Sequence, residues 1–258
     1  MVKIIGERIE LPGKVIVERP DRPYAFPRQI SPLITKTHIK PEDYALIQEG
    51  DEANSAISMI QRNFGERGKN HLDTNVEVLS SGLIVPRTSK FITQLINVNR
   101  ALGGKGVLYD ASGNLIESQR LRDYAHTLNH KCWARLNGSF EKGEGFLDLN
   151  VVYITGLENG NPVFQKEPLQ TCLEQDCYAD FESVNNQGFP TQKSPIQKYE
   201  PGKSIRFCYP RQNMAVGFGA YSDGADLSCS RNPQYTVAWL GVFDCAEDAS
   251  AEKLGDTK

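Results

Sequence analysis

Two histidines placed four residues apart, His126 and His130, have a spacing that suggests metal chemistry. In a helix, positions i and i+4 share one face, so both imidazoles could reach the same metal ion. Two ligands do not make a site, however, and no glutamate stands between them as it does in the H-E-x-x-H zinc motif. The spacing implies no third ligand. We therefore expect no bound metal and no other cofactor.

Sequence signals for covalent or phosphate chemistry are also missing. No G-x-S-x-G nucleophile motif occurs, and none of the six cysteines has a local group that would activate a thiolate. The bend Gly103-Gly104-Lys105-Gly106 lacks the G-x-x-x-x-G-K-[ST] spacing of a phosphate-binding loop. We expect a protein that is not an enzyme, and a hydrolase whose site has no sequence signature stays open as an alternative.

Basic, amide and aromatic side chains form a better-supported collection. Phosphate groups attract arginine and lysine, and unstacked bases pack on aromatic or guanidinium planes. One segment supplies Arg120, Lys131, Trp133 and Arg135. A second segment supplies Gln192, Lys193, Lys198, Lys203, Arg206 and Arg211. This set indicates an RNA-binding surface, and the alternative is that both segments are ordinary solvated faces.

The first of these segments must be a helix if its basic side chains are to lie together. Apolar residues recur there at the helical period and form one stripe: Leu121, Ala125, Leu128, Cys132 and Leu136. Ser118 is a suitable N-cap, and Asn137-Gly138 is a typical left-handed stop. A helix over 118–137 would pack its stripe on a sheet and leave Arg120, Lys131 and Arg135 together on a flank.

The remaining elements are mostly short and strand-like. We expect a strand pair over 3–19, a polar helix over 43–64, strands over 70–87, a strand or short helix from Phe91, a hairpin over 107–117 and a strand over 146–157. Residues 187–243 are typical of short strands broken by proline and glycine. Strands, one long helix and then further strands predict an α+β fold.

Composition bounds the class of protein. The chain has 258 residues, of which 39% are hydrophobic, and this favours a single α+β domain with inserted loops over 1–243. The segment 244–258 has five acidic residues and two lysines; it is expected to be a disordered tail and carries the whole formal charge of −3.

Compartment follows from segments that the sequence lacks. No apolar run is long enough for a membrane span, and the N-terminus has charges where a signal peptide would be apolar. We therefore expect a cytoplasmic protein with no membrane partner. The six cysteines have no metal-binding spacing and are expected to be buried or half-buried thiols.

A family resemblance gives these features a context. The stretch LRDYAHTLNHKCWARLNG resembles the palm helix of the type I-F CRISPR Cascade backbone subunit, a RAMP-type protein that polymerises along guide RNA. The shared pattern is carried by Leu121, Arg122, Tyr124-Ala125-His126, Leu128, Trp133 and Arg135 to Asn137. RALGG before this stretch, and GFPTQ, IRFCYPR and AVGFGAYS after it, resemble further segments of the family in the same order. The resemblance covers roughly residues 95–235.

The resemblance implies a modified RRM-like (ferredoxin-like) palm with inserted loops or a hairpin and a β-rich C-terminal half. It implies a non-catalytic subunit that binds single-stranded guide RNA (crRNA), supports target DNA binding through the guide, and stacks with other copies of itself and other subunits of an antiviral effector complex. The RNA-binding residues it implies are Arg120, Lys131, Trp133, Arg135, Asn137, Gln192, Lys193, Arg206 and Arg211. The alternative is a β-rich carbohydrate-binding or phage structural module that uses exposed aromatic residues of its C-terminal strands.

Overall fold

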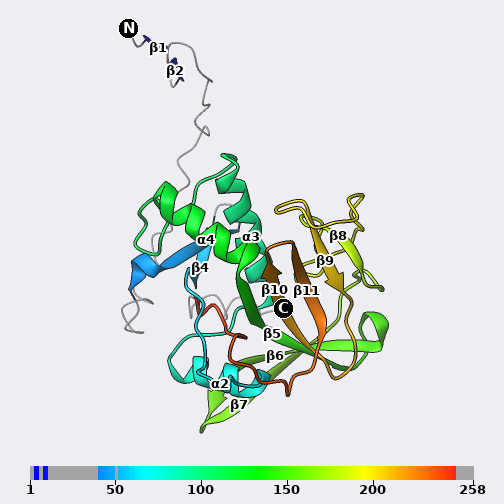
Figure 1. Ribbon diagram of the computed structural model, residues 1–258. Coiled ribbons are helices and arrows are strands. Elements are labelled where there is room, and N and C mark those ends of the chain that lie inside the picture. Colours follow the sequence, from blue (N-terminus) through cyan, green and yellow to red (C-terminus); the bar gives the residue numbers. More distant parts are fainter. Residues whose placement is uncertain (1–2, 6–7, 11–39, 50–51, 248–258) are drawn as a thin grey trace, which may run out of the picture.

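The computed structural model describes residues 3–5, 8–10, 40–49 and 52–247. They include the helices α2 (His71–Ser80), α3 (Thr88–Leu102) and α4 (Ser118–His130), and the short 3-10 helices η1 (Pro41–Asp43) and η2 (Phe146–Asp148). The strands are β1 (Lys3–Ile5), β2 (Arg8–Glu10), β3 (Tyr44–Glu49), β4 (Glu52–Ser58), β5 (Cys132–Lys142), β6 (Leu149–Glu158), β7 (Asn161–Pro168), β8 (Cys177–Asp180), β9 (Ser204–Cys208), β10 (Ala215–Tyr221), β11 (Gly224–Arg231) and β12 (Cys245–Glu247). Helices lie between strand-rich regions, which confirms the α+β class (Figure 1).

A seven-stranded sheet, in the order β7-β6-β5-β10-β11-β9-β8, organises most of the described chain. Its neighbouring strands are antiparallel except β11 and β9, which run parallel. A second sheet has the order β12-β4-β3, and β1 pairs with β2. In the second sheet, Cys245 and Ala246 pair with Ile57 and Ala56, so the end of the described chain completes a sheet begun near residue 44.

One face of the seven-stranded sheet packs on α3 and α4 (Figure 1). In-register residues of four neighbouring strands, Ala134, Phe218, Leu227 and Phe207, are buried on this face. The ring of Phe91 from α3 lies 4.9 Å from that of Phe218, between centroids. Because side chains alternate along a strand, the residues that precede and follow each of these four along its own strand point to the opposite face of the sheet. That second face carries the candidate site.

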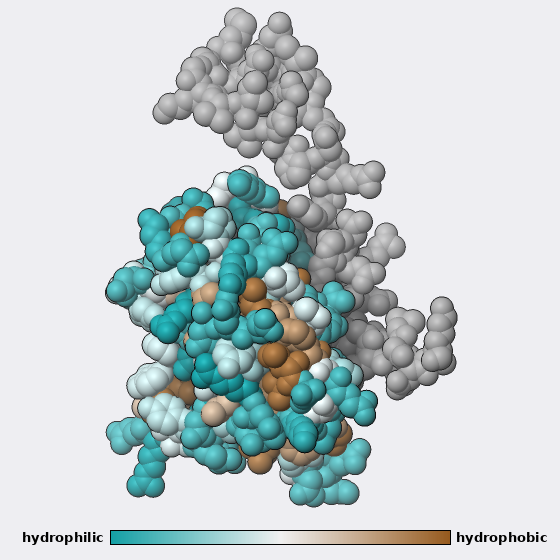
Figure 2. Space-filling view, turned by 90° about the vertical axis from the view of Figure 1, so that its right-hand side faces the viewer, coloured by the Kyte–Doolittle hydropathy of each residue, from teal (hydrophilic) through white to brown (hydrophobic). Residues whose placement is uncertain are grey.

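The surface of the protein is mostly hydrophilic, with apolar residues gathered in places. Figure 2 shows one side, where a band of apolar residues interrupts the hydrophilic ones. Large exposed side chains include Phe164, Tyr235 and Trp239, about half of whose surface is accessible. Among the described helices, none combines the length and the apolar character needed to cross a membrane.

The helix expected over 118–137 is wrong from Lys131 onward. α4 ends at His130, Lys131 leaves the helical range with φ −145°, and β5 begins at Cys132. Arg135 therefore lies on a strand and shares no helix flank with Arg120 and Lys131. Two further details of that expectation change. Ser118 is the first helical residue, after Glu117 as N-cap, and Asn137-Gly138 lies inside β5 instead of ending a helix.

Expectations for the other elements have mixed outcomes. β6, the Tyr109–Leu115 bridge, and β9 to β11 confirm the strand at 146–157, the hairpin at 107–117 and the short strands of 187–243. The segment from Phe91 belongs to the helix α3. The helix expected over 43–64 is wrong, because β3 and β4 form an antiparallel pair there. The strands expected over 70–87 are also wrong, because α2 occupies most of this segment. Of the pair expected over 3–19, β1 and β2 are present, and residues 11–19 lie outside the described part.

A disordered tail was expected from Asp244 onward, and this boundary is wrong. Asp244, Cys245 and Ala246 are buried, and Cys245–Glu247 forms β12. Residues 248–258 lie outside the described part of the chain. The cysteines are free thiols, buried except for the half-buried Cys177 and Cys208, as expected.

Candidate nucleic-acid interface

The sheet face opposite α3 and α4 carries a row of paired residues that crosses five strands. Trp133 of β5 pairs with Gly219 of β10, Gly219 pairs with Asp226 of β11, and Asp226 pairs with Arg206 of β9. Arg206 in turn pairs with Tyr178 of β8. Residues paired in register point to the same side of a sheet. Aromatic and charged side chains from distant parts of the sequence therefore share one face.

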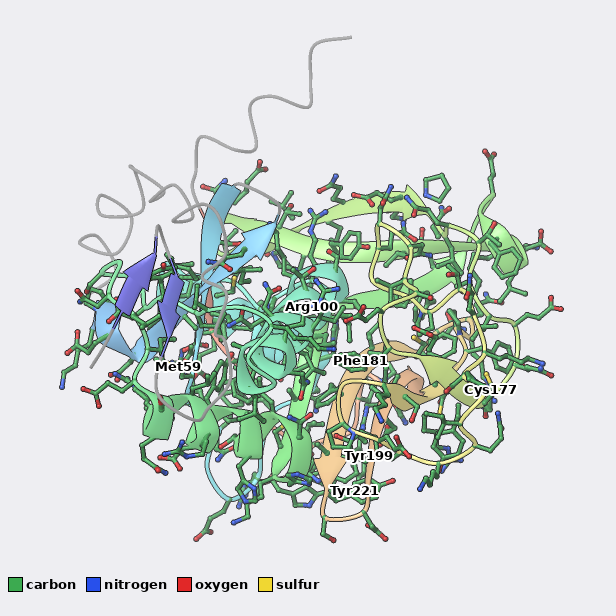
Figure 3. All side chains as sticks on the ribbon, turned by 90° about the horizontal axis from the view of Figure 1, so that it is seen from above. Met59, Arg100, Cys177, Phe181, Tyr199 and Tyr221 are labelled. Atoms are coloured by element: carbon green, nitrogen blue, oxygen red, sulfur yellow. The ribbon has the colours of Figure 1, made fainter. Side chains whose placement is uncertain are left out.

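Four side chains of this face form a cluster that we call the aromatic patch: Trp133, Tyr221, Arg231 and Trp239. The rings of Trp133 and Tyr221 stack, with centroids 5.9 Å apart and planes 15° from parallel. Trp239 meets Trp133 edge-on at 4.9 Å, and the Arg231 guanidinium carbon lies 5.0 Å from the Trp133 centroid. Tyr221 lies at the tip of the β10–β11 hairpin, at the margin of the molecule (Figure 3). The patch thus combines an aromatic stack with a cation.

Two glycines form the floor beneath the aromatic patch. A Cβ atom at Gly219 would lie 2.8 Å from carbon atoms of the Trp133 ring, and one at Gly217 would lie 2.5 Å from Arg231 Nε. Any other residue at either position would push the ring or the guanidinium off the sheet. The alternation Gly217, Gly219, Tyr221 along β10 therefore lets Trp133 and Arg231 lie flat across the strand.

Charge on this face is mostly positive. Arg231 Nη2 donates to Asp226 Oδ2 at 3.2 Å, and Arg206 is the in-register neighbour of the same Asp226. Arg135 lies on the same side of β5, two residues from Trp133, and is almost fully buried. Its Nη2 donates to the carbonyl oxygens of Lys69 and Tyr235. Two guanidinium groups, those of Arg231 and Arg206, thus act on the one carboxylate of Asp226, and such an excess of positive charge attracts anions.

The pKa values of these groups reflect burial and crowding of like charge. Burial, and then the nearby Arg231, lowers the pKa of Arg135 to about 10. Burial raises the pKa of Asp226, although Arg231 and Arg206 act against that shift. The like charges of Arg135 and Arg231 therefore lie close enough to act on each other.

The RNA-binding residues expected from the sequence divide between the two faces. Trp133 and Arg206 share the patch face, with Arg135 buried on the same side of β5. Arg120 belongs to α4, which packs on the opposite face, and its Nη2 forms an ion pair with Asp43 at 2.7 Å. Lys131 is exposed at the end of α4. The expected flank of Arg120, Lys131 and Arg135 is therefore not a common surface.

Asn137 has a structural role between β5 and β6. It is buried, its Nδ2 donates to Ile154 O at 2.8 Å, and its Oδ1 accepts from Ile154 N at 2.9 Å. The side chain thereby replaces a backbone pair between β5 and β6, so its amide is not available to RNA.

The downstream basic residues lie around β8 and β9. Gln192 and Lys193 are exposed beside β8, where Asp180 N donates to Gln192 O. Arg211 forms an ion pair with Asp176 at 3.1 Å and lies over the ring of Tyr209. Among these residues, only Arg206 is placed by strand register in the row that contains Trp133.

The two histidines of α4 are near each other, with ring centroids 5.2 Å apart. Within the described residues, no group of three or more histidine, cysteine, aspartate or glutamate side chains could hold a metal ion. The absence of a metal remains a prediction for the whole chain.

Sequence reasoning missed Tyr221, Arg231 and Trp239. Their positions on the face depend on strand pairing between segments far apart in the sequence, which no local pattern reports. One signal was present: small residues at every second position of "GFGAY" (Gly217 to Tyr221) indicate a strand whose outer face is covered by neighbouring side chains.

Comparison with known proteins gives no significant match, since neither a family model, nor a curated protein, nor a solved structure resembles this chain closely enough.

Proposed function

We propose that this protein binds single-stranded RNA on the sheet face that carries the aromatic patch, and that it does so without catalysis. The observation that carries the proposal is the Trp133–Tyr221 stack beside Arg231, on the face not covered by α3 and α4. Unstacked bases pack on aromatic rings and guanidinium planes, whereas phosphates need cations within reach of the same strand. Arg206 and Arg231 supply those cations on neighbouring strands.

The finer proposal is a guide-RNA-binding backbone subunit of a CRISPR effector complex. Its support is the sequence resemblance over roughly residues 95–235, together with a sheet that has helices on one face and aromatic side chains on the other, as an RRM-like palm requires. In this role, copies of the chain stack along one guide RNA, contact other subunits of the complex and bind target DNA through the guide. Trp133 and Arg206 hold the RNA, while Arg135 and Asn137 support β5 from inside.

A carbohydrate-binding module is the second candidate. Exposed aromatic rings also stack on sugar rings, and Trp239 and Tyr235 are each about half exposed. The two candidate ligands differ in charge. Binding of a neutral sugar does not require the positive charges of Arg206 and Arg231 on the same face, whereas binding of anionic RNA does. RNA binding therefore accounts for more of the site.

The test is RNA affinity in a Tyr221→Ala variant, measured by fluorescence anisotropy with single-stranded RNA. Tyr221 is partly exposed at a hairpin tip, so the variant should fold. We expect weaker binding by about 1–3 kcal/mol, the contribution of one stacked base. Wild-type affinity in this variant, or a wild-type protein that binds a soluble oligosaccharide and no RNA, would remove the proposal.

The finer proposal has its own measurement. Protein purified from its native cells should carry RNA, seen as an absorbance ratio at 260 and 280 nm that falls as salt rises. Sequencing of that RNA should return guide transcripts, and the number of bound copies should increase with RNA length. RNA of random sequence would contradict the CRISPR role while leaving RNA binding in place.

A further inference from the structure

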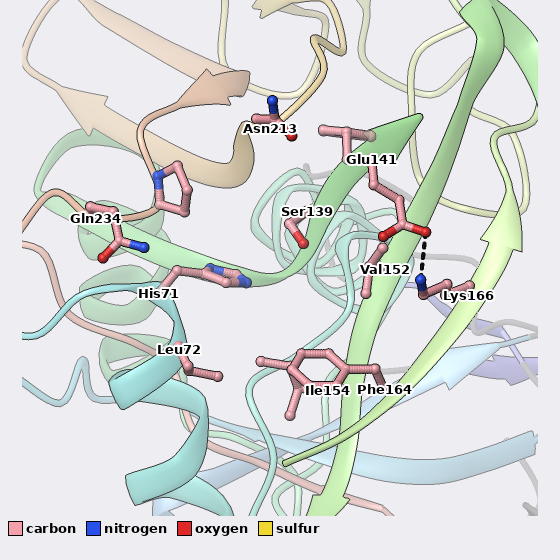
Figure 4. A pocket seen from close by; sticks show the side chains of 12 residues that line it. His71, Leu72, Ser139, Glu141, Val152, Ile154, Phe164, Lys166, Asn213 and Gln234 are labelled. Carbon is pink, nitrogen blue, oxygen red and sulfur yellow. Dashed lines mark ion pairs between the residues drawn. The ribbon is translucent and has the colours of Figure 1, made fainter. Parts of the chain in front are cut away.

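A pocket of about 480 Å³ opens on the same face of the sheet as the aromatic patch, toward the other end of β5, between the start of α2 and the strands β5 to β7 (Figure 4). We call it the β5–β7 pocket. Ser139 and Glu141 line it from β5, at the alternating positions that continue from Trp133 and Arg135. Pro233 and Gln234 line it from the segment that leads on to Trp239. The pocket and the patch therefore share both a strand and a loop.

The wall of the β5–β7 pocket is mostly apolar. Val152 and Ile154 of β6, Leu72 of α2 and Phe164 of β7 line it. Phe164 is 51% exposed and Leu72 is 41% exposed, although both belong to the residue types that normally avoid water. Figure 4 shows Ile154 and Phe164 grouped below Ser139 and opposite Leu72. An apolar ligand face would bury these side chains.

The charges around the β5–β7 pocket cancel. Lys166 Nζ pairs with Glu141 Oε1 at 2.8 Å, as the dashed line in Figure 4 marks. Two backbone amide groups at the start of α2 are already engaged: Asp73 N donates to Asn70 Oδ1, and His71 N donates to Pro233 O. Burial, and then Arg135, lowers the pKa of His71 to about 4, so this histidine is neutral at physiological pH. The pocket therefore suits an uncharged ligand better than a phosphate or a carboxylate.

Three neutral polar side chains at the pocket could form hydrogen bonds with a ligand. The side chains of Ser139, Asn213 and Gln234 make no hydrogen bond to the part of the chain that the structure describes. Each of these groups can both donate and accept. Asn213 has φ 62°, a left-handed conformation, and its backbone N donates to Phe140 O at 2.7 Å. The turn between β9 and β10 thus holds the side-chain amide of Asn213 at the pocket.

We propose that the β5–β7 pocket binds an uncharged nitrogen heterocycle of nucleobase size. An amide side chain can form two hydrogen bonds with a base edge, and Phe164 offers a surface for stacking. The volume lies within the range of pockets that enclose small molecules. Two sources supply this chemistry: a free nucleoside, or one unstacked base of an RNA strand on the aromatic patch. The second source rests on the proposed function.

The experiment titrates the full chain with adenosine, guanosine, cytidine and uridine, followed by saturation-transfer NMR, with ribose 5-phosphate as the probe that lacks a base. We expect binding of at least one nucleoside and none of ribose 5-phosphate. Phe164→Ser and Asn213→Gly should each weaken nucleoside binding about tenfold, the effect of losing one stacking or hydrogen-bonding partner. Both should fold, because Phe164 is exposed and glycine accepts a positive φ.

Leu115→Ser is the matched control, since Leu115 is 60% exposed on the 107–117 hairpin and does not line the pocket. It should leave nucleoside binding as in the wild type. The proposal is overturned if no nucleoside binds at millimolar concentration, if ribose 5-phosphate binds as well as the nucleosides, or if the pocket variants bind like the wild type.

Competition between single-stranded RNA and a bound nucleoside distinguishes the two sources. It also tests the pocket proposal independently of RNA binding. If a base of the strand enters the pocket, RNA displaces the nucleoside, and Tyr221→Ala weakens RNA binding while nucleoside affinity stays unchanged. If RNA leaves the nucleoside in place, the free nucleoside is the ligand. If the protein binds nucleosides and no RNA, the proposed function fails and the pocket assignment stands.

Discussion

Arg135 holds a positive charge inside the protein, beneath the exposed rings of the aromatic patch. Its guanidinium bonds two carbonyl oxygens, from Lys69 and Tyr235, and so ties two loops to the middle of β5. A carboxylate at this position would face those oxygens with like partial charge and without a donor. The side chain therefore supports the shape of the patch and does not reach a ligand.

Arg135→Glu should unfold or strongly destabilise the protein. Breaking a buried charged arrangement costs about 3–5 kcal/mol, because the remaining groups stay desolvated and unpaired. Lys131→Glu is the matched control, since Lys131 is exposed at the end of α4, and it should leave the melting temperature nearly unchanged. Calorimetry of both variants checks the prediction. A folded Arg135→Glu protein with wild-type stability would contradict the buried position.

His71 should make the stability of the protein depend on pH. Its folded-state pKa, about 4, lies below the ordinary value of 6.5, because burial and then Arg135 disfavour the imidazolium. The unfolded chain therefore takes up the proton first. The stabilising effect is complete above the unfolded pKa and is lost as pH falls toward the folded one. From about pH 7 to about pH 5, this costs on the order of 2 kcal/mol.

Urea denaturation at the two pH values measures this effect. In a His71→Leu variant the fall in stability between them should shrink by that amount. His126→Gln, which removes an exposed histidine, is the control and should keep the wild-type fall, because His71 is still present. An NMR titration in which His71 protonates near its ordinary pKa would refute the prediction.

The boundary between α4 and β5 shows why one long helix was wrongly predicted over 118–137. Leu128, Cys132 and Leu136 are spaced by four, and a spacing of four fits a helical stripe and also fits every second position of a strand. Cys132, Ala134 and Leu136 alternate with Trp133 and Arg135, and the strand period is the one that the fold uses. Pairing with β10, whose Gly217 and Gly219 accommodate the large outer side chains, decides between the two periods.

The predictions for two other segments, 43–64 and 70–87, were wrong for local physical reasons. Tyr44, Ala45, Leu46 and Ile47 of β3 are all buried, so this strand shows no apolar–polar alternation to distinguish it from a helix. The sequence of α2 does carry a helix signal, because Asn70 is a favourable N-cap residue and caps the helix by accepting from Asp73 N. The strand at 146–157 was predictable because its apolar run is short, β-branched and bounded by turns.

β12 should be needed for full stability. Ala246 is buried among Val78, Leu83, Val85 and Val242, and β12 pairs with β4 over three residues. Truncation after Cys245 removes Ala246 and Glu247 with their ladder to β4, and we expect a loss of about 1–2 kcal/mol. Truncation after Glu247 is the control, because it keeps β12 intact. The prediction fails if both truncated proteins unfold at the same urea concentration.

The formal charge of −3 gives the protein no general attraction to RNA, so the proposed binding would depend on the local positive charge of the patch face. Of the site residues expected from the sequence, Trp133 and Arg206 lie on that face, Arg135 is buried on the same side of β5, and the others are dispersed. The order of elements in the sequence could predict the α+β class, and the side-chain types could only suggest candidate residues. The choice of face depends on sheet order, which local patterns do not encode.

The salt dependence of RNA binding should locate the charge contacts. If Arg206 contacts one phosphate, Arg206→Gln should lower the slope of log affinity against log salt by about 0.7, the value for one contact with a single strand. Arg122→Gln is the control, because Arg122 is exposed on α4 on the opposite face of the sheet, and its slope should match the wild type. Equal slopes for all three proteins would place the RNA elsewhere.

The pairing of β12 with β4 also sets an order of events during synthesis. β4 leaves the ribosome long before residues 245–247 exist; at about 5–20 residues per second, the delay is roughly ten seconds or more. Through that interval the β3–β4 hairpin has an open edge where β12 will later pair, and such edges attract other chains. Polypeptides released before residue 247 would keep this edge, and we expect chaperones and proteases to distinguish them from completed protein by it.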